Sequence, residues 1–219
     1  MLLSKTMRIA LGAALAISIR LLAAQTPSGV ADTPTVPKFT DVNRGILDLV
    51  IQDQWDRGMD MFGGRMVKPP QSIDRKQVGP RDDARHLAVR KLLAEGKLQS
   101  GKDYNFAGLI FQHSGESADL ILAHALAVTA VAKGEGNAKW LAAATFDRYL
   151  HSIKQPQVFG TQLFREAGGP WSMEPYDRTA LSDSVRAVWC VVPLADQIGI
   201  ERDARDGKPP RPTQIQGCN

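Results

Sequence analysis

Apolar residues recur at every third or fourth position along much of the chain, which is the period of an α-helix that buries one face. Residues suited to capping or ending a helix stand between these stretches, such as Asp41 before the first and Gly63-Gly64 after it. No stretch alternates between apolar and polar residues for long enough to predict a sheet. The pattern predicts five long helices, at about 41–62, 82–95, 103–113, 117–132 and 139–153.

The stretch 120–132 is apolar on every side except at His124 and Thr129. Such a helix is normally enclosed by other helices, and this one is too short to cross a membrane. The remaining segments are less regular: a loop at 65–80, a turn at 168–170, an extended stretch at 171–176 and a short helix at 181–189. We therefore predict an all-α fold, a compact bundle of five to six helices with an irregular C-terminal part.

Small residues stand at every fourth position at Ala130, Gly134 and Ala138, a spacing that lets two antiparallel helices approach closely across a tight turn. This pattern resembles the helical hairpin of tetratricopeptide and Sel1-type repeats. A second copy would be expected about 34 residues away, and the sequence contains none. We predict one repeat-like hairpin within the bundle and no repeat array.

The first 24 residues have the layout of a secretory signal peptide. Lys5 and Arg8 precede an apolar segment at 9–19, and small residues follow at 22–24. Such a signal would direct the chain to the periplasm or out of the cell, and a retained N-terminal anchor is the alternative. The domain boundaries we expect are a signal peptide at 1–24, a flexible linker at 25–40, a helical domain at 41–198 and a disordered tail at 199–219.

The charge balance depends on this leader. The full chain has 27 basic and 23 acidic residues, for a net charge of +4. Lys5, Arg8 and Arg20 would be removed with the leader, which leaves 24 basic against 23 acidic residues. The sequence has no clustered basic face of the kind that nucleic acids bind. We expect no nucleic-acid partner and no stable membrane span after leader removal.

The two cysteines stand in different surroundings. Cys190 lies in an apolar run and fits a small buried side chain, whereas Cys218 follows a proline-rich segment in a polar tail. An oxidising compartment would permit a disulfide between them. One buried thiol and one loose thiol are the simpler interpretation.

Several polar residues occur where exposure to solvent does not explain them. His113 ends the helix expected at 103–113, where it either caps free carbonyls or acts as a proton acceptor near neutral pH. Asp147 and Arg148 lie in the helix expected at 139–153, as a structural ion pair or as an acid and a cation that face a ligand. His124, deep in an apolar helix, is expected to be a core histidine with a hydrogen-bond partner. The catalytic candidates are His113, Asp147 and Arg148.

The segment 155–162 is rich in side-chain amides, and Gly160 lets its backbone approach another group closely. These amides either hold the loop against the bundle or recognise a ligand. The ligand-binding candidates are Gln112, Gln157, Thr161 and Gln162. Short turns should bring the end of the helix at 103–113 and the later part of the helix at 139–153 to the same end of the bundle. We expect His113 and Asp147 to lie within about 15 Å of each other, roughly the length of ten helical residues.

Recognised catalytic signatures are absent from the sequence. It contains no HExxH motif, cysteine cluster, phosphate-binding loop, dinucleotide fingerprint or serine-hydrolase elbow. Asp53 and Asp56 stand one turn apart, either as paired carboxylates or as surface acids. We expect no metal and no cofactor. The leading hypothesis is a domain that binds a peptide or small polar ligand; the alternative is a hydrolase with His113 as general base.

Four short motifs occur together in a recognisable order. They are Asp53-Gln54-Trp55-Asp56-Arg57, Phe111-Gln112-His113, Asp147-Arg148 and Gln157-x-Phe159-Gly160-Thr161-Gln162. Over roughly 45–195 the chain resembles a bacterial family catalogued as a domain of unknown function. The resemblance implies a helical domain with a shared polar centre and supplies no activity.

Overall fold

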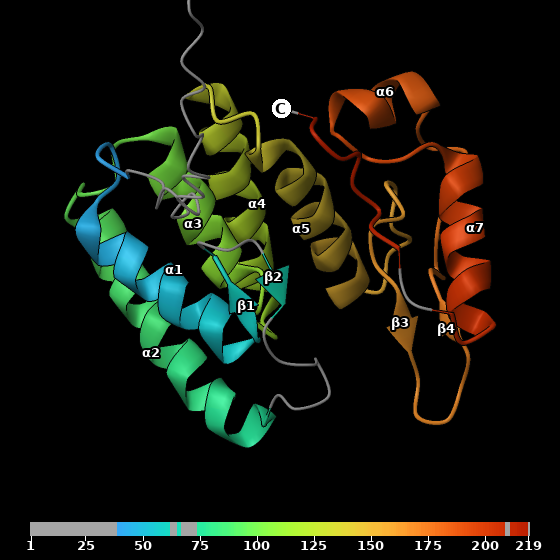
Figure 1. Cartoon of the computed structure of the whole chain (residues 1–219), viewed down its shortest axis with the longest axis horizontal. Helices are drawn as coiled ribbons and strands as arrows, with labels where there is room; N and C mark the ends of the chain where they lie inside the picture. The colour runs from blue at the N-terminus through green and yellow to red at the C-terminus, as the bar shows by residue number, and fades with distance from the viewer. Residues whose placement is uncertain (1–38, 62–64, 67–73, 209–210, 219) are drawn as a thin grey trace, which may run out of the picture. The chain divides into compact units, whose positions relative to one another are not determined.

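The structure is a computed structural model that describes residues 39–61, 65–66, 74–208 and 211–218 (Figure 1). The expected signal peptide at 1–24 and nearly all of the expected linker at 25–40 lie outside the described residues. The described part is mostly helical, which confirms the predicted all-α class. Its seven helices are α1 (Arg44–Asp56), α2 (Arg75–Ala94), α3 (Gly101–Phe111), α4 (Ser117–Ala132), α5 (Ala138–Ser152), α6 (Asp183–Val188) and α7 (Leu194–Arg205).

The strands of the described residues form two small antiparallel sheets of two strands each. β1 (Met59–Asp60) pairs with β2 (Arg65–Met66), and β3 (Phe164–Arg165) pairs with β4 (Trp171–Ser172). No helix in the described part of the chain is long and apolar enough to cross a membrane.

The helix α4 packs against both α3 and α5 (Figure 1). Its Ala123, Ala127 and Ala130 are fully buried, and these small side chains let the neighbouring helices approach closely. On α3, a methyl group added at Gly108 would lie only 3.2 Å from the Ala123 carbonyl oxygen. The enclosure of α4 is incomplete, because Ile121 is partly exposed. The predicted hairpin is confirmed as α4–α5.

The helix α2 begins earlier than the sequence pattern predicts. The expected loop at 65–80 is wrong for its last part, because α2 starts at Arg75 and contains Pro80. Asp74 caps this end by accepting a hydrogen bond from the Lys76 backbone N–H at 3.0 Å. Ion pairs from Arg81 and Asp82 to α1 then hold this first part of the helix in place. Helix α1 also ends at Asp56, short of the expected glycine pair.

The expectation of a disordered tail at 199–219 is wrong for the residues that the structure describes. α7 continues to Arg205, and its Ile200 packs in a core cluster with Met173 and Tyr176. Beyond the helix, Thr213 accepts a hydrogen bond from the Val192 N–H at 3.0 Å. The domain boundary that we expected at 198 falls inside α7. Little in the sequence indicates this helix, because only a few apolar residues lie on its buried side.

A disulfide joins Cys190 to Cys218, with their Cα atoms 5.6 Å apart. The simpler interpretation of two unpaired thiols is therefore wrong. The Ile215 N–H donates to the Cys190 carbonyl at 2.8 Å, and this backbone pairing brings the tail close enough for the bond.

We predict that reducing this disulfide lowers the free energy of unfolding by about 3 kcal/mol, because the bond closes a loop of 28 residues in the unfolded chain. Urea unfolding with and without a reductant measures the change. Cys218→Ser should show the same loss and no further response to the reductant. Equal stability with and without the bond would contradict the prediction.

Candidate functional site

The carboxylate of Asp147 anchors the loop that follows α5. It is fully buried and accepts hydrogen bonds from the backbone N–H groups of Val158, Phe159 and Thr161, at 2.9, 3.0 and 2.9 Å. The Thr161 hydroxyl donates a fourth, at 2.7 Å. Burial raises the pKa of Asp147, and these hydrogen bonds oppose the rise. All four donors belong to the loop at 158–161. Asp147 therefore has a structural role in place of the catalytic one considered from the sequence.

The amides of the loop are used in the same way. The Gln157 side chain donates to the Gln162 carbonyl at 3.0 Å and accepts from the Gln162 N–H at 3.1 Å. Gly160 has a φ of +70°, and a methyl group there would lie 2.6 Å from the Tyr176 ring. Gln157, Thr161 and Gln162 are therefore buried and hold the loop, the first of the two roles considered for them.

Gln112, His113 and Arg148 do come together. They line one cavity of about 620 Å³ with residues from the end of α1, the start of α2 and the segment after α3. We call this the Arg148 cavity, and its other lining residues are Arg57, Val78, Gly79, Asp82, Ser114 and Gly115. The predicted convergence of α3 and α5 is thus confirmed for three side chains. Asp147 and Gln162 instead face the loop.

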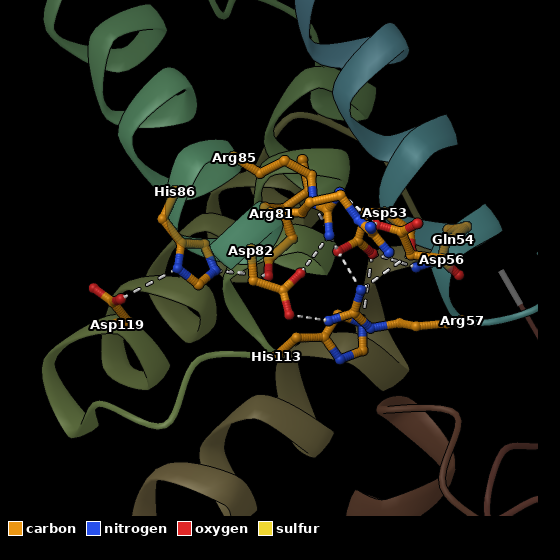
Figure 2. Close-up of polar contacts among 11 residues, drawn as sticks. Asp53, Gln54, Asp56, Arg57, Arg81, Asp82, Arg85, His86, His113 and Asp119 are labelled. Carbon is orange, nitrogen blue, oxygen red and sulfur yellow. Dashed lines mark hydrogen bonds and ion pairs between the residues drawn. The ribbon is translucent and has the colours of Figure 1, made fainter. Parts of the chain in front are cut away.

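An ion-pair cluster joins α1 to α2 (Figure 2), and two of its members, Arg57 and Asp82, also line the cavity. Arg57 bridges Asp53 at 2.9 Å and Asp82 at 2.8 Å. Asp56 on α1 pairs with Arg81 at 2.8 Å and with Arg85 at 2.9 Å, both on α2. Within α2, Arg85 also pairs with Asp82. The cluster is defined by Asp53, Asp56, Asp82, Arg57, Arg81 and Arg85. Asp53 and Asp56 are consequently neither paired carboxylates nor surface acids.

His113 faces this cluster. Its Nε2 atom lies 3.6 Å from the Asp53 carboxylate, beyond hydrogen-bond distance, and it has no hydrogen-bond partner among the described residues. Burial holds the pKa of His113 well below its usual value, and the charges of Arg57 and Arg148 lower it further. His113 is therefore neutral at pH 7. Its acidic neighbour is Asp53, where the sequence suggested Asp147.

Arg148 is the unbalanced charge of the cavity. Within the described residues its guanidinium has no ion-pair partner, and its buried Nε–H donates no hydrogen bond. The segment 62–73, part of which lies outside the description, contains no Asp or Glu that could pair with it. Burial lowers the pKa of Arg148, and the nearby charge of Arg57 adds to this effect. Arg148 is therefore a largely buried cation without a counter-ion among the described residues, an arrangement that costs free energy.

Two other histidines have structural roles. His124 on α4 bonds the Ala142 carbonyl on α5 at 2.9 Å, as expected of a core histidine. His86 was not singled out from the sequence. Its ring stacks on Phe111, and its Nε2 donates to the Ile110 carbonyl at 3.2 Å, so it fixes the end of α3 that carries Gln112 and His113.

No group of three or more His, Cys, Asp or Glu side chains in the described part of the chain is arranged to hold a metal ion. Comparison with protein-family models, with curated proteins and with solved structures yields no match. The assignment of a function therefore depends on the geometry of the Arg148 cavity.

Asp53 gives the cluster a measurable pH dependence. Burial raises the pKa of Asp53 to about 6, against the attraction of Arg57, the hydrogen bond from Gln54 and the charge of Arg85. Between about pH 4 and pH 6 the folded protein holds a proton that the unfolded chain has lost, so its stability falls as the pH rises through this range. Asp53→Asn removes this titration.

We predict that the stability of the wild type relative to Asp53→Asn falls by about 3 kcal/mol between pH 4 and pH 7. Urea unfolding across this range measures the difference. The comparison is needed because His113 acts in the opposite direction, since its lowered pKa removes stability as the pH falls. A constant difference between the two proteins would show that Asp53 titrates near its ordinary pKa.

Proposed function

We propose that the Arg148 cavity binds a small ligand with a carboxylate or phosphate group, and that this binding is the function of the domain. The unpaired guanidinium of Arg148 is the observation that supports it. A buried charge without a partner costs several kcal/mol, and a bound anion would remove that cost. The cavity volume of about 620 Å³ lies within the usual range for sites of small molecules.

The remaining lining groups suit a polar ligand. Gln112 is buried at the end of α3, and its side-chain amide can both donate and accept a hydrogen bond. Arg57 and Asp82 bind each other and so contribute little net charge. A peptide or another small polar molecule with one anionic group therefore fits the cavity better than an apolar ligand.

The proposal includes export of the chain, which the leader pattern at 1–24 favours. The disulfide between Cys190 and Cys218 supports an oxidising compartment, because such bonds are rare in the reducing cytosol. The ligand would then be one that is present in the periplasm or outside the cell.

Two arginines of the same cavity provide a matched test. We predict that Arg148→Met raises the free energy of unfolding by about 1–3 kcal/mol without ligand, because it removes a buried charge that has no partner. Arg57→Met should lower it by about 3–5 kcal/mol, because it leaves Asp53 and Asp82 without their shared partner. Urea unfolding of the three proteins measures both changes.

Binding is tested with the same Arg148 variant. Acetate and inorganic phosphate, each added at constant ionic strength, should raise the melting temperature of the wild type more than that of Arg148→Met. The difference between the proteins removes the general effect of salts on stability. Equal responses of the two proteins to both anions would refute the proposed function, as would a loss of stability in Arg148→Met similar to that in Arg57→Met.

A second candidate is a hydrolase in which His113 is the general base. The observation that favours it is the 3.6 Å separation between His113 Nε2 and Asp53, because a nearby carboxylate can orient a histidine and stabilise its protonated form. In such a reaction His113 takes a proton from water as the water oxygen attacks an ester carbonyl, and returns it to the leaving oxygen. The low pKa of His113 makes it a weak base, so we rank this activity second.

Two esters, one with a free carboxylate and one without, test the hydrolase activity. The mono-4-nitrophenyl ester of succinate keeps a free carboxylate for Arg148, whereas 4-nitrophenyl acetate does not. If the domain is a hydrolase, we predict that it cleaves the succinate ester at least about tenfold faster and that His113→Gln abolishes the difference, as expected for loss of a positioned base. Release of 4-nitrophenolate measures both rates. Rates equal to those in buffer would rule out this activity for carboxylate esters.

A further inference from the structure

The charges around the Arg148 cavity can be counted, because their pairing is visible. In the ion-pair cluster, three arginines meet three aspartates, and each of the six side chains contacts a group of opposite charge (Figure 2). His113 is neutral at pH 7. The neighbouring pair of Arg90 and Asp119 is balanced as well. Among the described residues of the cavity lining, the ion-pair cluster and this pair, Arg148 supplies the single positive charge in excess.

From this balance we infer that the ligand of the Arg148 cavity carries one negative charge, as a monocarboxylate on a neutral polar body. The inference rests on the proposed function and narrows it from anions in general to one class. One negative charge leaves the site neutral. A dianion such as a phosphate monoester or sulfate leaves one negative charge in excess, which a low-dielectric site disfavours.

The neutral body is inferred from the rest of the lining. Gln112 offers a side-chain amide, which pairs with an amide or hydroxyl and compensates no charge. Gly115 of the lining is exposed, and a methyl group built there would meet no atom within 4 Å, so the cavity is open to solvent on this side. Val78 adds one apolar contact. A carboxylate joined to an amide therefore matches both Arg148 and Gln112.

Three small probes separate charge from shape. N-acetylglycine carries one carboxylate and an amide, N-acetylglycinamide is its neutral counterpart, and sulfate is a compact dianion. Isothermal titration calorimetry at pH 8 and constant ionic strength compares them on the wild type and Arg148→Met. We expect N-acetylglycine to bind the wild type at least about tenfold more tightly than the other two, and Arg148→Met to remove this preference.

The outcomes distinguish the inference from the proposed function. Sulfate that binds as tightly as N-acetylglycine, and does so through Arg148, would overturn the single-charge inference and leave anion binding in place. If N-acetylglycinamide binds as tightly as N-acetylglycine, or if neither anion depends on Arg148, both proposals fail.

A second variant tests the charge balance itself. Asp53→Asn keeps the shape of a fully buried side chain and removes one negative charge from the cluster. The site then has two positive charges in excess, so the affinity for sulfate should rise by about tenfold relative to that for N-acetylglycine. An unchanged ratio would mean that the cluster does not set the preferred ligand charge, and would overturn the inference.

Discussion

The hydrogen bonds that Asp147 accepts determine how α5 is oriented in the molecule. Its carboxylate is bound to the backbone of the loop at 158–161, so the helix cannot rotate without breaking several buried hydrogen bonds. Successive residues of a helix point about 100° apart. Because Asp147 points to the loop, Arg148 is directed to a different side, where it lines the cavity. The loop that seemed a candidate for recognition thus positions the residue that we propose to bind the ligand.

The two arginines of the cavity illustrate which electrostatic effect dominates. Arg57 is desolvated as well, but its ion pairs with Asp53 and Asp82 offset that cost. Arg148 is also largely buried and has no such compensation among the described residues. Unpaired buried charges are rarely retained for stability alone, and strongly perturbed groups gather at functional sites. The contrast between two residues of one type in one cavity is therefore stronger evidence than the lowered pKa of Arg148 by itself.

The sequence predicted those features that depend on a long regular pattern. The apolar stretch at 120–132 became the central helix α4, and short turns on either side of it were sufficient to bring His113 and Arg148 together. The sequence could not show that Asp147 and Arg148 have different roles. Adjacent residues of a helix belong to the same apolar pattern, although their side chains face different surroundings. The start of α2 was missed because Pro80 resembles a helix breaker, and its pairs with α1 depend on residues about 25 positions apart. The ordered tail likewise depends on a disulfide that spacing alone does not reveal.

The charge of the site also depends on where the protein is found. Burial raises the pKa of Asp53 to about 6, so this carboxyl becomes protonated in mildly acidic surroundings, whereas burial holds the pKa of His113 well below its usual value. The excess charge beside the cavity then grows from one to two without any change in the backbone. Asp53 pairs with Arg57 and lies 3.6 Å from His113, and both of these residues line the Arg148 cavity. In the proposed site Asp53 would therefore set the charge while Arg148 makes the contact.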